Sequence, residues 1–299
     1  MIDLHMHSVY SDGTAEIIDI LKRAEELKLS TISITDHETI NAYNEIYNID
    51  IKKYFSGKII PGIELKMQYK NKIIDVLGYG IDYKKMREFL KERYGESGRA
   101  EIQIKQLNDF YEYGRQYGLV LSPMEELVWD KEREWASIVF YDEMKKHEEN
   151  KLKVPSDLWE DFICFKKKYY NKEGEMFYID RAKYYPLMED MLEVIHKSEG
   201  LAFVAHIYEY GWMKDKLEEL KNMISNFKID GVECYYSKFT NEQINGLVEF
   251  CKENNLFMSG GTDYHGDNRP EIEIGIGKGE LKVPYSIISN WIDKVNIIK

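Results

Sequence analysis

Hydrophobic and polar residues alternate in short runs near both ends of the chain, a pattern typical of half-buried β-strands. Strands are predicted over residues 2–7, 31–35, 58–65, 72–79, 201–206, 230–235 and 256–262. Apolar residues at helical spacing follow the first strand and predict a helix capped by Thr14; they are Ile17, Ile20, Leu21, Ala24 and Leu27. Helical patterns also cover residues 214–227 and 240–254. The chain therefore alternates strands with helices.

The order of these elements predicts an α/β fold. Alternation of strands and helices implies right-handed crossovers and a parallel sheet. Polar residues lie at the carboxyl ends of the predicted strands, and a closed barrel places its chemistry at that end. We therefore expect a seven-stranded β/α barrel. An open, doubly wound sheet is the alternative, but candidate site residues from both ends of the chain favour closure.

Residues 84–186 interrupt this alternation. The segment is rich in Lys, Glu, Tyr and Trp, and its pattern is mostly helical. We expect a barrel domain built from residues 1–83 and 187–299, with residues 84–186 as a helical insertion over the C-terminal face of the barrel. Most aromatic residues of the insertion are expected to form its core, with stacking of a nucleobase as the alternative.

Charge narrows the choice of partners. The 299 residues include 41 Lys and Arg against 53 Asp and Glu, which gives a formal net charge of −12. A protein this acidic is a poor candidate for binding long nucleic acid through its general field. A phosphorylated small molecule or a nucleotide remains a suitable substrate if metal ions supply local positive charge.

The remaining composition indicates a cytoplasmic protein. Cys164, Cys234 and Cys251 form no CxxC pair, which argues for a reducing compartment and against a zinc–thiolate site. The N-terminal residues lack the basic and apolar regions of a signal peptide. No apolar run approaches the ~20 residues that span a bilayer, so no membrane association is expected.

Histidine and carboxylate residues gather around the ends of the predicted strands. His5 and His7 are two apart in a strand, so both side chains point to one face and can reach one metal ion. The other candidates are Asp12, His37, Glu64, Asp75, His206, Asp263 and His265. Imidazole and carboxylate donors without thiolate suit Mn²⁺, Fe²⁺ or Zn²⁺. Each residue alone has an ordinary structural role available, but their coincidence predicts a metal centre.

The motifs HMHS-x3-DG, ITDH, PGIE, LAFVAH and GGTDYHG together resemble those of the PHP (polymerase and histidinol phosphatase) superfamily. The resemblance spans the first 82 residues and about 201–277. It implies a distorted seven-stranded β/α barrel with two or three metal ions that hydrolyses phosphate esters. The aspartate in the SDG motif and the helical insertion after the fourth strand resemble the branch that contains nucleoside 3′,5′-bisphosphate phosphatases.

This resemblance implies three metal positions. His5, His7, Glu64 and Asp263 would form the first and carry catalysis; Glu64, Asp75 and His206 the second; Asp12, His37 and His265 the third. The branch usually has His-Ile-x-Gly in the fourth strand, where this chain has Asp75-Val76-Leu77-Gly78. We expect Asp75 to bind the second ion in place of the imidazole, which would tilt that position toward Mn²⁺ or Mg²⁺.

Few basic residues accompany the expected ligands. Arg133, Arg181 and Lys183, in or near the insertion, are candidates for binding substrate. Arg269 is the preferred candidate because it lies four residues after His265. Glu233 ends a strand and is expected to support the ligands as a hydrogen-bond acceptor.

These residues predict a metal-dependent hydrolase of phosphate monoesters on a small metabolite or nucleotide, in which a metal-activated water is the nucleophile. Three alternatives stay open: a histidinol-phosphate phosphatase, a 5′-exonuclease of short RNA or nucleotides, and a non-catalytic metal-binding module. The intact ligand set disfavours the last of these.

Overall fold

The computed structural model describes residues 1–94, 98–131 and 133–298. It divides into two compact units, one formed by Met1–Arg93 with Pro186–Lys299 and the other by Tyr94–Tyr185. The second unit begins at Tyr94 rather than at residue 84, because helix α3 (Tyr83–Tyr94) lies almost wholly in the first unit.

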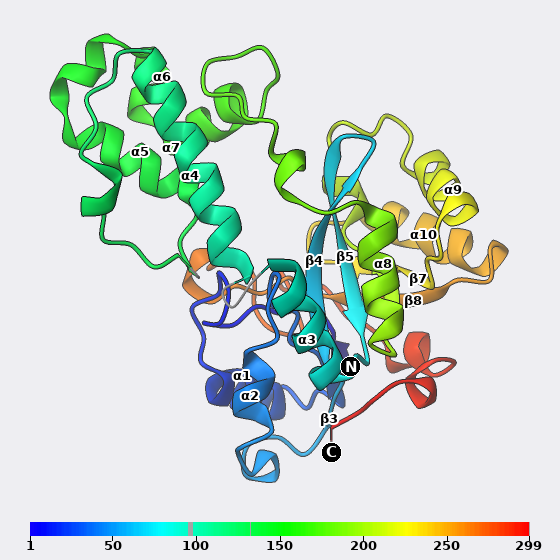
Figure 1. The fold of residues 1–299 in the computed structure, drawn as a ribbon. Coiled ribbons are helices and arrows are strands. Elements are labelled where there is room, and N and C mark those ends of the chain that lie inside the picture. The colour runs from blue at the N-terminus through cyan, green and yellow to red at the C-terminus, as the bar shows by residue number, and fades with distance from the viewer. Residues whose placement is uncertain (95–97, 132, 299) are drawn as a thin grey trace. The chain divides into compact units, whose positions relative to one another are not determined.

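The first unit alternates strands and helices in chain order (Figure 1). Its strands are β1 (Ile2–Asp3), β2 (Thr31–Ile32), β3 (Lys58–Ile59), β4 (Gly62–Tyr69), β5 (Lys72–Tyr79), β6 (Leu201–Val204), β7 (Gly231–Tyr236) and β8 (Phe257–Gly261). Its other helices are α1 (Ile17–Glu26), α2 (Ala42–Ile46), α8 (Met188–Lys197), α9 (Lys216–Asn226) and α10 (Asn241–Glu253). The α/β class expected from the sequence is confirmed.

Within residues 1–94, 98–131 and 133–298 the strands form two sheets rather than a closed seven-stranded barrel. One sheet has three parallel strands in the order β1-β2-β3, and the other has five in the order β4-β5-β6-β7-β8. β5 is antiparallel to both β4 and β6, whereas β6, β7 and β8 are parallel, so the expectation of a wholly parallel sheet was wrong. Single bridges at Met6–Tyr264 and His37–Glu64 link the two sheets.

One of the predicted strands is divided at a proline. The strand predicted over residues 58–65 divides into β3 and β4 around Pro61, which has no N–H with which to continue a ladder. β4 and β5 then form a long hairpin (Figure 1). Glu64 therefore lies near the start of β4, and Asp75 lies in the middle of β5. Glu64 is therefore not at the carboxyl end of its strand, where the sequence placed it, whereas Asp75 lies within its strand as expected.

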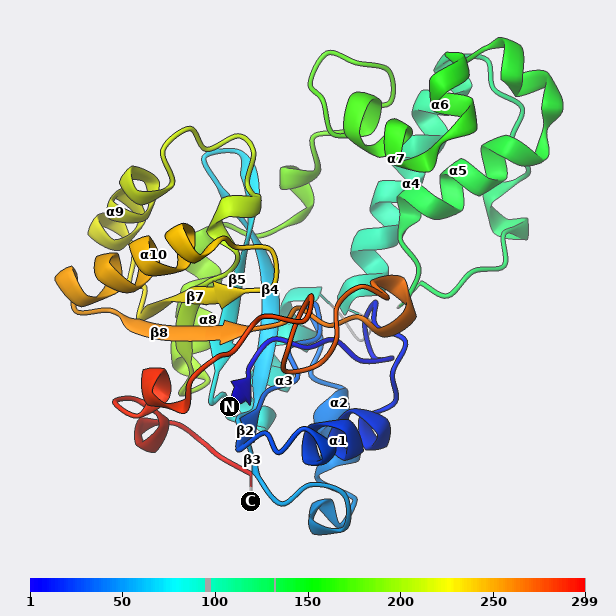
Figure 2. The same cartoon turned by 180° about the vertical axis from the view of Figure 1, so that it is seen from behind.

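One buried apolar cluster ties the N-terminal strand to β5, β6 and the C-terminal segment, which Figure 2 shows in red. Its members are Ile2, Leu4, Ile60, Leu77, Tyr79, Phe203, Ala205, Leu281, Val283, Ile288, Trp291 and Ile292. The Tyr79 hydroxyl donates to the Leu4 carbonyl at 2.9 Å, and Trp291 Nε1 donates to the Met258 carbonyl at 3.0 Å. These bonds satisfy the polar atoms of the two buried rings. The cluster fixes the segment that leads to His5.

Helix α1 buries the apolar stripe that the sequence indicated, except that its last member, Leu27, lies just beyond the helix. The predicted cap was wrong, because the helix begins after Glu16 without a side-chain hydrogen bond. Thr14 Oγ1 instead accepts the N–H of Asp267 at 2.8 Å, and the N–H of Thr14 donates to the His265 carbonyl. Thr14 therefore joins the loop after β1 to the loop after β8.

The second unit is helical, with α4 (Gly98–Gln116), α5 (Ala136–Lys146), α6 (Ser156–Glu160) and α7 (Phe162–Cys164). Its core is aromatic: the rings of Phe110 and Phe140 stack with centroids 5.1 Å apart. Tyr141, Trp159 and Tyr170 belong to the same buried cluster. Across the part of the chain that the structure describes, no helix is long and apolar enough to cross a bilayer.

Candidate metal centre

The histidines and carboxylates that the sequence singled out lie together in the first unit. Donor atoms within 4.8 Å of one another form three overlapping groups: His5, His7, Glu64 and Asp263; His7, Asp12, His37 and His265; and His37, Glu64 and Asp75. His206 joins them through its Nε2 atom, which lies 2.9 Å from Glu64 Oε1. Residues far apart in the sequence thus share one cluster.

The segments that follow β1 and β8 bring most of these residues together. The N–H of Asp263 donates to the His5 carbonyl at 2.7 Å, and the N–H of His7 donates to the Tyr264 carbonyl at 2.8 Å. The two segments therefore continue side by side beyond the regular strands. His5, His7 and Asp263 consequently meet at one end of the sheets.

The spacing of the first group fits a shared metal ion. Donor atoms about 2.1 Å from one ion, at tetrahedral or octahedral angles, lie about 3.0–3.4 Å apart. Glu64 Oε2 lies 3.3 Å from His5 Nε2 and 3.1 Å from His7 Nε2. Asp263 Oδ1 lies 3.5 Å from His5 Nε2 and 3.3 Å from His7 Nε2. Three of the four contacts fall within the spacing that an ion would impose, and the fourth, between His5 and Asp263, lies just above it.

Hydrogen bonds on the far side of the rings direct two imidazoles toward the cluster. His5 Nδ1 lies 2.8 Å from Glu233 Oε1, so Nδ1 carries a proton and Nε2 faces inward, where it can ligate an ion once its own proton is released. His265 Nδ1 lies 2.9 Å from the Asp263 carbonyl, which can only accept a hydrogen bond. His265 Nε2 is buried and has no hydrogen-bond partner among the described residues, as is also true of His7 Nε2. Such atoms suit metal ligation.

The second group is looser and depends on Asp36. Asp12 Oδ1 lies 3.3 Å from His265 Nε2, and Asp12 Oδ2 lies 3.7 Å from His37 Nε2. Asp36 accepts hydrogen bonds from the Ser8 N–H at 2.8 Å and from the Ser11 hydroxyl at 2.5 Å. Asp36 is buried and holds the loop that presents Asp12, rather than facing the other donors itself.

The two carboxylate oxygens of Asp263 have different partners. Oδ1 faces the histidines, whereas Oδ2 accepts a hydrogen bond from the Tyr236 hydroxyl at 2.8 Å and pairs with the Arg269 guanidinium. Arg269, the preferred candidate for binding substrate, therefore contacts an expected ligand directly. About a third of its side chain, 32%, stays exposed.

Neighbouring cations keep the central carboxylates ionised. Burial by itself would raise the pKa of Asp263, but Arg269 and the adjacent imidazoles hold that pKa well below its ordinary value. Burial likewise opposes the charge on Glu64, yet His37 and His5 hold its pKa well below the usual range. The centre therefore offers carboxylates that need no deprotonation to bind a cation.

Asp75 has a different neighbour from the one expected. Its Oδ1 lies 2.9 Å from Lys66 Nζ, a charge contact in which that oxygen accepts no hydrogen bond from the described residues. Its Oδ2 lies 4.0 Å from His206 Nε2 and 3.4 Å from the Tyr210 hydroxyl. Lys66 Nζ also lies 2.9 Å from His37 Nδ1.

Two of the clustered residues have an unusual backbone. His206 has φ of 26° and Asp263 has φ of 58°, in the left-handed region that non-glycine residues seldom adopt. Such conformations cost of order 1–3 kcal/mol each and gather at functional sites. The strain favours a functional role for this end of the sheets.

The basic residues expected from the insertion lie in the second unit. Arg133 is exposed there. Arg181 donates to Asn171 Oδ1 at 2.7 Å, and Lys183 pairs with Asp109. A substrate-binding role for Arg133 stays a prediction.

Sequence reasoning missed Lys66, Tyr236 and the supporting role of Asp36. Lys66 could have been found, because it lies two residues after Glu64 in a strand and so shares its face. Tyr236 and Asp36 carry no such signal. Their roles depend on contacts between segments that no periodicity reveals.

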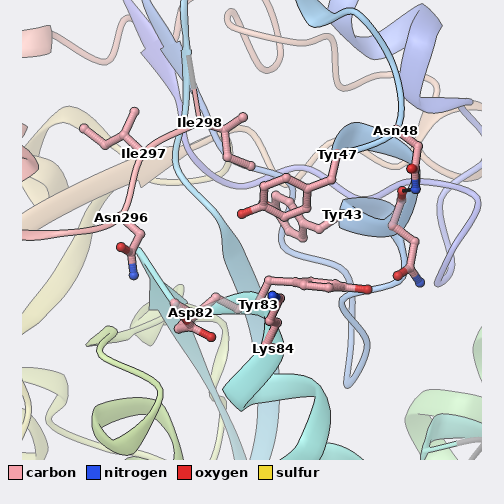
Figure 3. Close-up of a pocket in the computed structure, with 11 residues that line it drawn as sticks. Tyr43, Tyr47, Asn48, Asp82, Tyr83, Lys84, Asn296, Ile297 and Ile298 are labelled. Carbon is pink, nitrogen blue, oxygen red and sulfur yellow. Dashed lines mark hydrogen bonds between the residues drawn. The ribbon is translucent and has the colours of Figure 1, made fainter.

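A separate cavity of about 730 Å³ lies between α2, the start of α3 and the C-terminal segment (Figure 3). The rings of Tyr47 and Tyr83 meet there with centroids 5.4 Å apart. None of its lining residues is an expected metal ligand, so this cavity is not the candidate active site.

Comparisons with known proteins identify the family of this chain and one relative that matches nearly all of it. The PHP domain family matches residues 3–205. The 5′-3′ exoribonuclease Rnm of Salmonella typhimurium is 25% identical over 292 residues, which cover 97% of this chain and 92% of that protein.

Two solved structures share the fold. A candidate metal-dependent phosphoesterase from Bifidobacterium adolescentis has a TM-score of 0.69 at 18% identity, covering 98% of this chain and 96% of that one. An amidohydrolase from Chromobacterium violaceum has a TM-score of 0.70 at 18% identity, covering 100% of this chain and 97% of the other. With the family match over most of its length, this chain belongs to the PHP domain family.

Proposed function

We propose that this chain hydrolyses phosphoester bonds of nucleotides and short oligoribonucleotides, using divalent metal ions held by the histidine–carboxylate cluster. The observation that supports this most is the convergence of His5 Nε2, His7 Nε2 and Glu64 Oε2 at the spacing of shared ligands, with Asp263 Oδ1 completing the set. Nitrogen and oxygen donors without thiolate suit Mn²⁺, Fe²⁺ or Zn²⁺.

We propose ions at two of the three donor groups. His5, His7, Glu64 and Asp263 would hold one ion, and Asp12, His37 and His265 would hold another. When bound, divalent ions supply positive charge for phosphoryl oxygens and lower the pKa of a water that then attacks phosphorus.

The chain's own residues prepare these positions. Glu64 presents Oε2 to His5 and His7 and Oε1 to His206, so it suits a ligand shared between neighbouring positions. Glu233 fixes the ring of His5, and Tyr236 fixes the carboxylate of Asp263. Pre-set ligands of this kind need little reorganisation when charge develops in the transition state. Arg269, beside Asp263 and partly exposed, is proposed to contact a substrate phosphate.

Two substrate classes fit this centre, and the comparisons favour one of them. Phosphate monoesters on a nucleotide or small metabolite need only the ions and Arg269. The Salmonella protein that matches nearly the whole chain is named a 5′-3′ exoribonuclease, which favours the end of an RNA chain as substrate. The net charge of −12 favours substrates with few phosphates. We therefore propose short RNA, with nucleoside bisphosphates as its smallest form; histidinol phosphate has less support.

The test compares substrates on Mn²⁺-loaded protein. Short 5′-phosphorylated RNA, long RNA, a nucleoside 3′,5′-bisphosphate and histidinol phosphate are incubated separately, and products are separated by chromatography. We expect nucleotides to be released from short RNA faster than from long RNA, with loss of activity on chelation and recovery with Mn²⁺. Full turnover by chelated protein, or hydrolysis of histidinol phosphate alone, contradicts the proposal.

A further inference from the structure

Lys66 occupies a position that no metal-ligand pattern assigns to a lysine. It lies in β4 two residues after Glu64, so both side chains share one face of the strand. Its partner in the hairpin register is Asp75 of β5. Glu64, Lys66 and Asp75 therefore project from the same side of the hairpin.

The ammonium of Lys66 lies among the third group of donor atoms. Its Nζ lies 2.9 Å from Asp75 Oδ1 and 2.9 Å from His37 Nδ1. His37 and Asp75, with Glu64, are the three residues whose donor atoms come within 4.8 Å of one another in that group. Only 14% of the Lys66 side chain is exposed, so the ammonium belongs to the centre rather than to the surface.

An ammonium and a divalent ion compete for such a place. An ion would sit about 2.1 Å from the same nitrogen and oxygen that Lys66 contacts, which leaves no room for Nζ at its present distance. Like charges this close also repel strongly where water is scarce. Asp75, flanked by Ile74 and Val76, needs one cation beside it, and Lys66 supplies that cation within the fold.

We propose that Lys66 is a built-in cation that takes the place of one metal ion at the position formed by His37, Glu64 and Asp75. This inference rests on the proposed metal centre and limits the number of ions in it. The chain then uses fewer ions than its donor groups could hold. A lysine contributes a fixed single charge at this corner, whereas a metal ion would contribute two charges and a water of lowered pKa.

Counting bound ions tests this substitution without an activity assay. Wild-type protein and Lys66→Met are saturated with Mn²⁺, passed through a desalting column, and measured for manganese per chain by mass spectrometry. We expect two ions in the wild type and one additional ion in Lys66→Met, because Asp75 then lacks its cation. The double variant Lys66→Met/Asp75→Leu removes both charges and should return to the wild-type count.

A matched control is Lys70→Met, which removes an exposed lysine of the same hairpin that pairs with Glu219. It should leave the count unchanged. Three ions in the wild type, or equal counts in the wild type and Lys66→Met, overturn the inference. If Lys66→Met does not fold, the wild-type count decides: two ions support the inference and three overturn it. Absence of bound manganese from every protein would instead contradict the proposed function.

Discussion

Glu233 Oε1 lies 2.8 Å from His5 Nδ1, and this contact leaves His5 Nε2 facing Glu64 and Asp263. Glu233 also accepts the backbone N–H of His206 at 2.9 Å through its other oxygen. One buried carboxylate of β7 therefore sets the direction of an imidazole after β1 and of the backbone after β6.

Replacing Glu233 by glutamine tests this positioning role. Glu233→Gln keeps the shape of the side chain but removes the charge that favours the Nδ1 proton of His5. Loss of such a supporting acceptor typically weakens metal binding 10–100-fold, and we expect about that loss of Mn²⁺ affinity. Calorimetric titration measures it, and circular dichroism checks that the fold is retained.

A second histidine–carboxylate pair provides the control. His196 Nε2 lies 2.7 Å from Asp230 Oδ2, outside the cluster. Asp230→Asn should leave Mn²⁺ affinity unchanged. Equal effects of Glu233→Gln and Asp230→Asn would show that Glu233 acts only through stability.

The protonation of His7 gives metal binding a pH dependence. Burial opposes the charge on His7, but the adjacent carboxylates of Asp263 and Glu64 outweigh it and raise the pKa of His7 from 6.5 to about 9. The metal-free protein therefore holds a proton there at neutral pH, and a bound ion must displace it. We expect Mn²⁺ affinity to rise between pH 6.5 and 9, with proton release.

The raised pKa of His7 also stabilises the metal-free fold, and this stabilisation has the opposite dependence on pH. That stabilisation is complete below the unfolded pKa of 6.5 and is lost as the pH rises through about 9. Thermal melts of chelated protein at several pH values measure it. Titrations in buffers of different ionisation enthalpy report the protons released by Mn²⁺, and affinity that is flat across this pH range would contradict the assignment.

Arg269 is placed to act on Asp263, on the substrate, or on both. Arg269→Met removes the guanidinium that holds the Asp263 carboxylate in place, and we expect about a tenfold loss of Mn²⁺ affinity together with a higher KM. Arg23→Met, which removes an arginine paired with Glu26 and Glu273, is the control. A rise in KM with unchanged metal affinity would assign Arg269 to substrate alone.

The second unit has a core of its own. Removing a side chain from this core should lower the free energy of unfolding of the unit. Phe140 is fully buried and packs against Phe110 and Phe165. Phe140→Ala should destabilise this unit by about 3–5 kcal/mol. Ile138→Ala, at a partly exposed position of the same helix, should cost far less. Denaturant unfolding compares the two variants, and similar losses would argue against an aromatic core.

Local spacing was enough to predict much of the site. His5 and His7 are two residues apart in an extended segment, and this spacing alone places both rings on one face. The positions of His37 and Asp263, each just after an apolar run, indicated the end at which they meet. These signals depend only on neighbouring residues. They therefore still apply, although the regular strands in the structure are shorter than predicted.

Other features depend on contacts between distant segments. The strand predicted over residues 58–65 extends as β4 to Tyr69 by pairing with β5, a pairing that the local pattern did not indicate. Thr14 looked like a helix cap but binds the segment after β8 instead. Lys66 was overlooked because it lies just beyond the strand predicted over residues 58–65, and its contacts with Asp75 and His37 appear only in three dimensions.

Anomalous diffraction from crystals soaked with Mn²⁺ tests the metal centre most directly. We predict a strong manganese peak about 2.0–2.2 Å from His5 Nε2, His7 Nε2 and the facing oxygens of Glu64 and Asp263. A map from well-ordered crystals that shows no peak between these four residues at saturating Mn²⁺ would contradict the proposed metal centre.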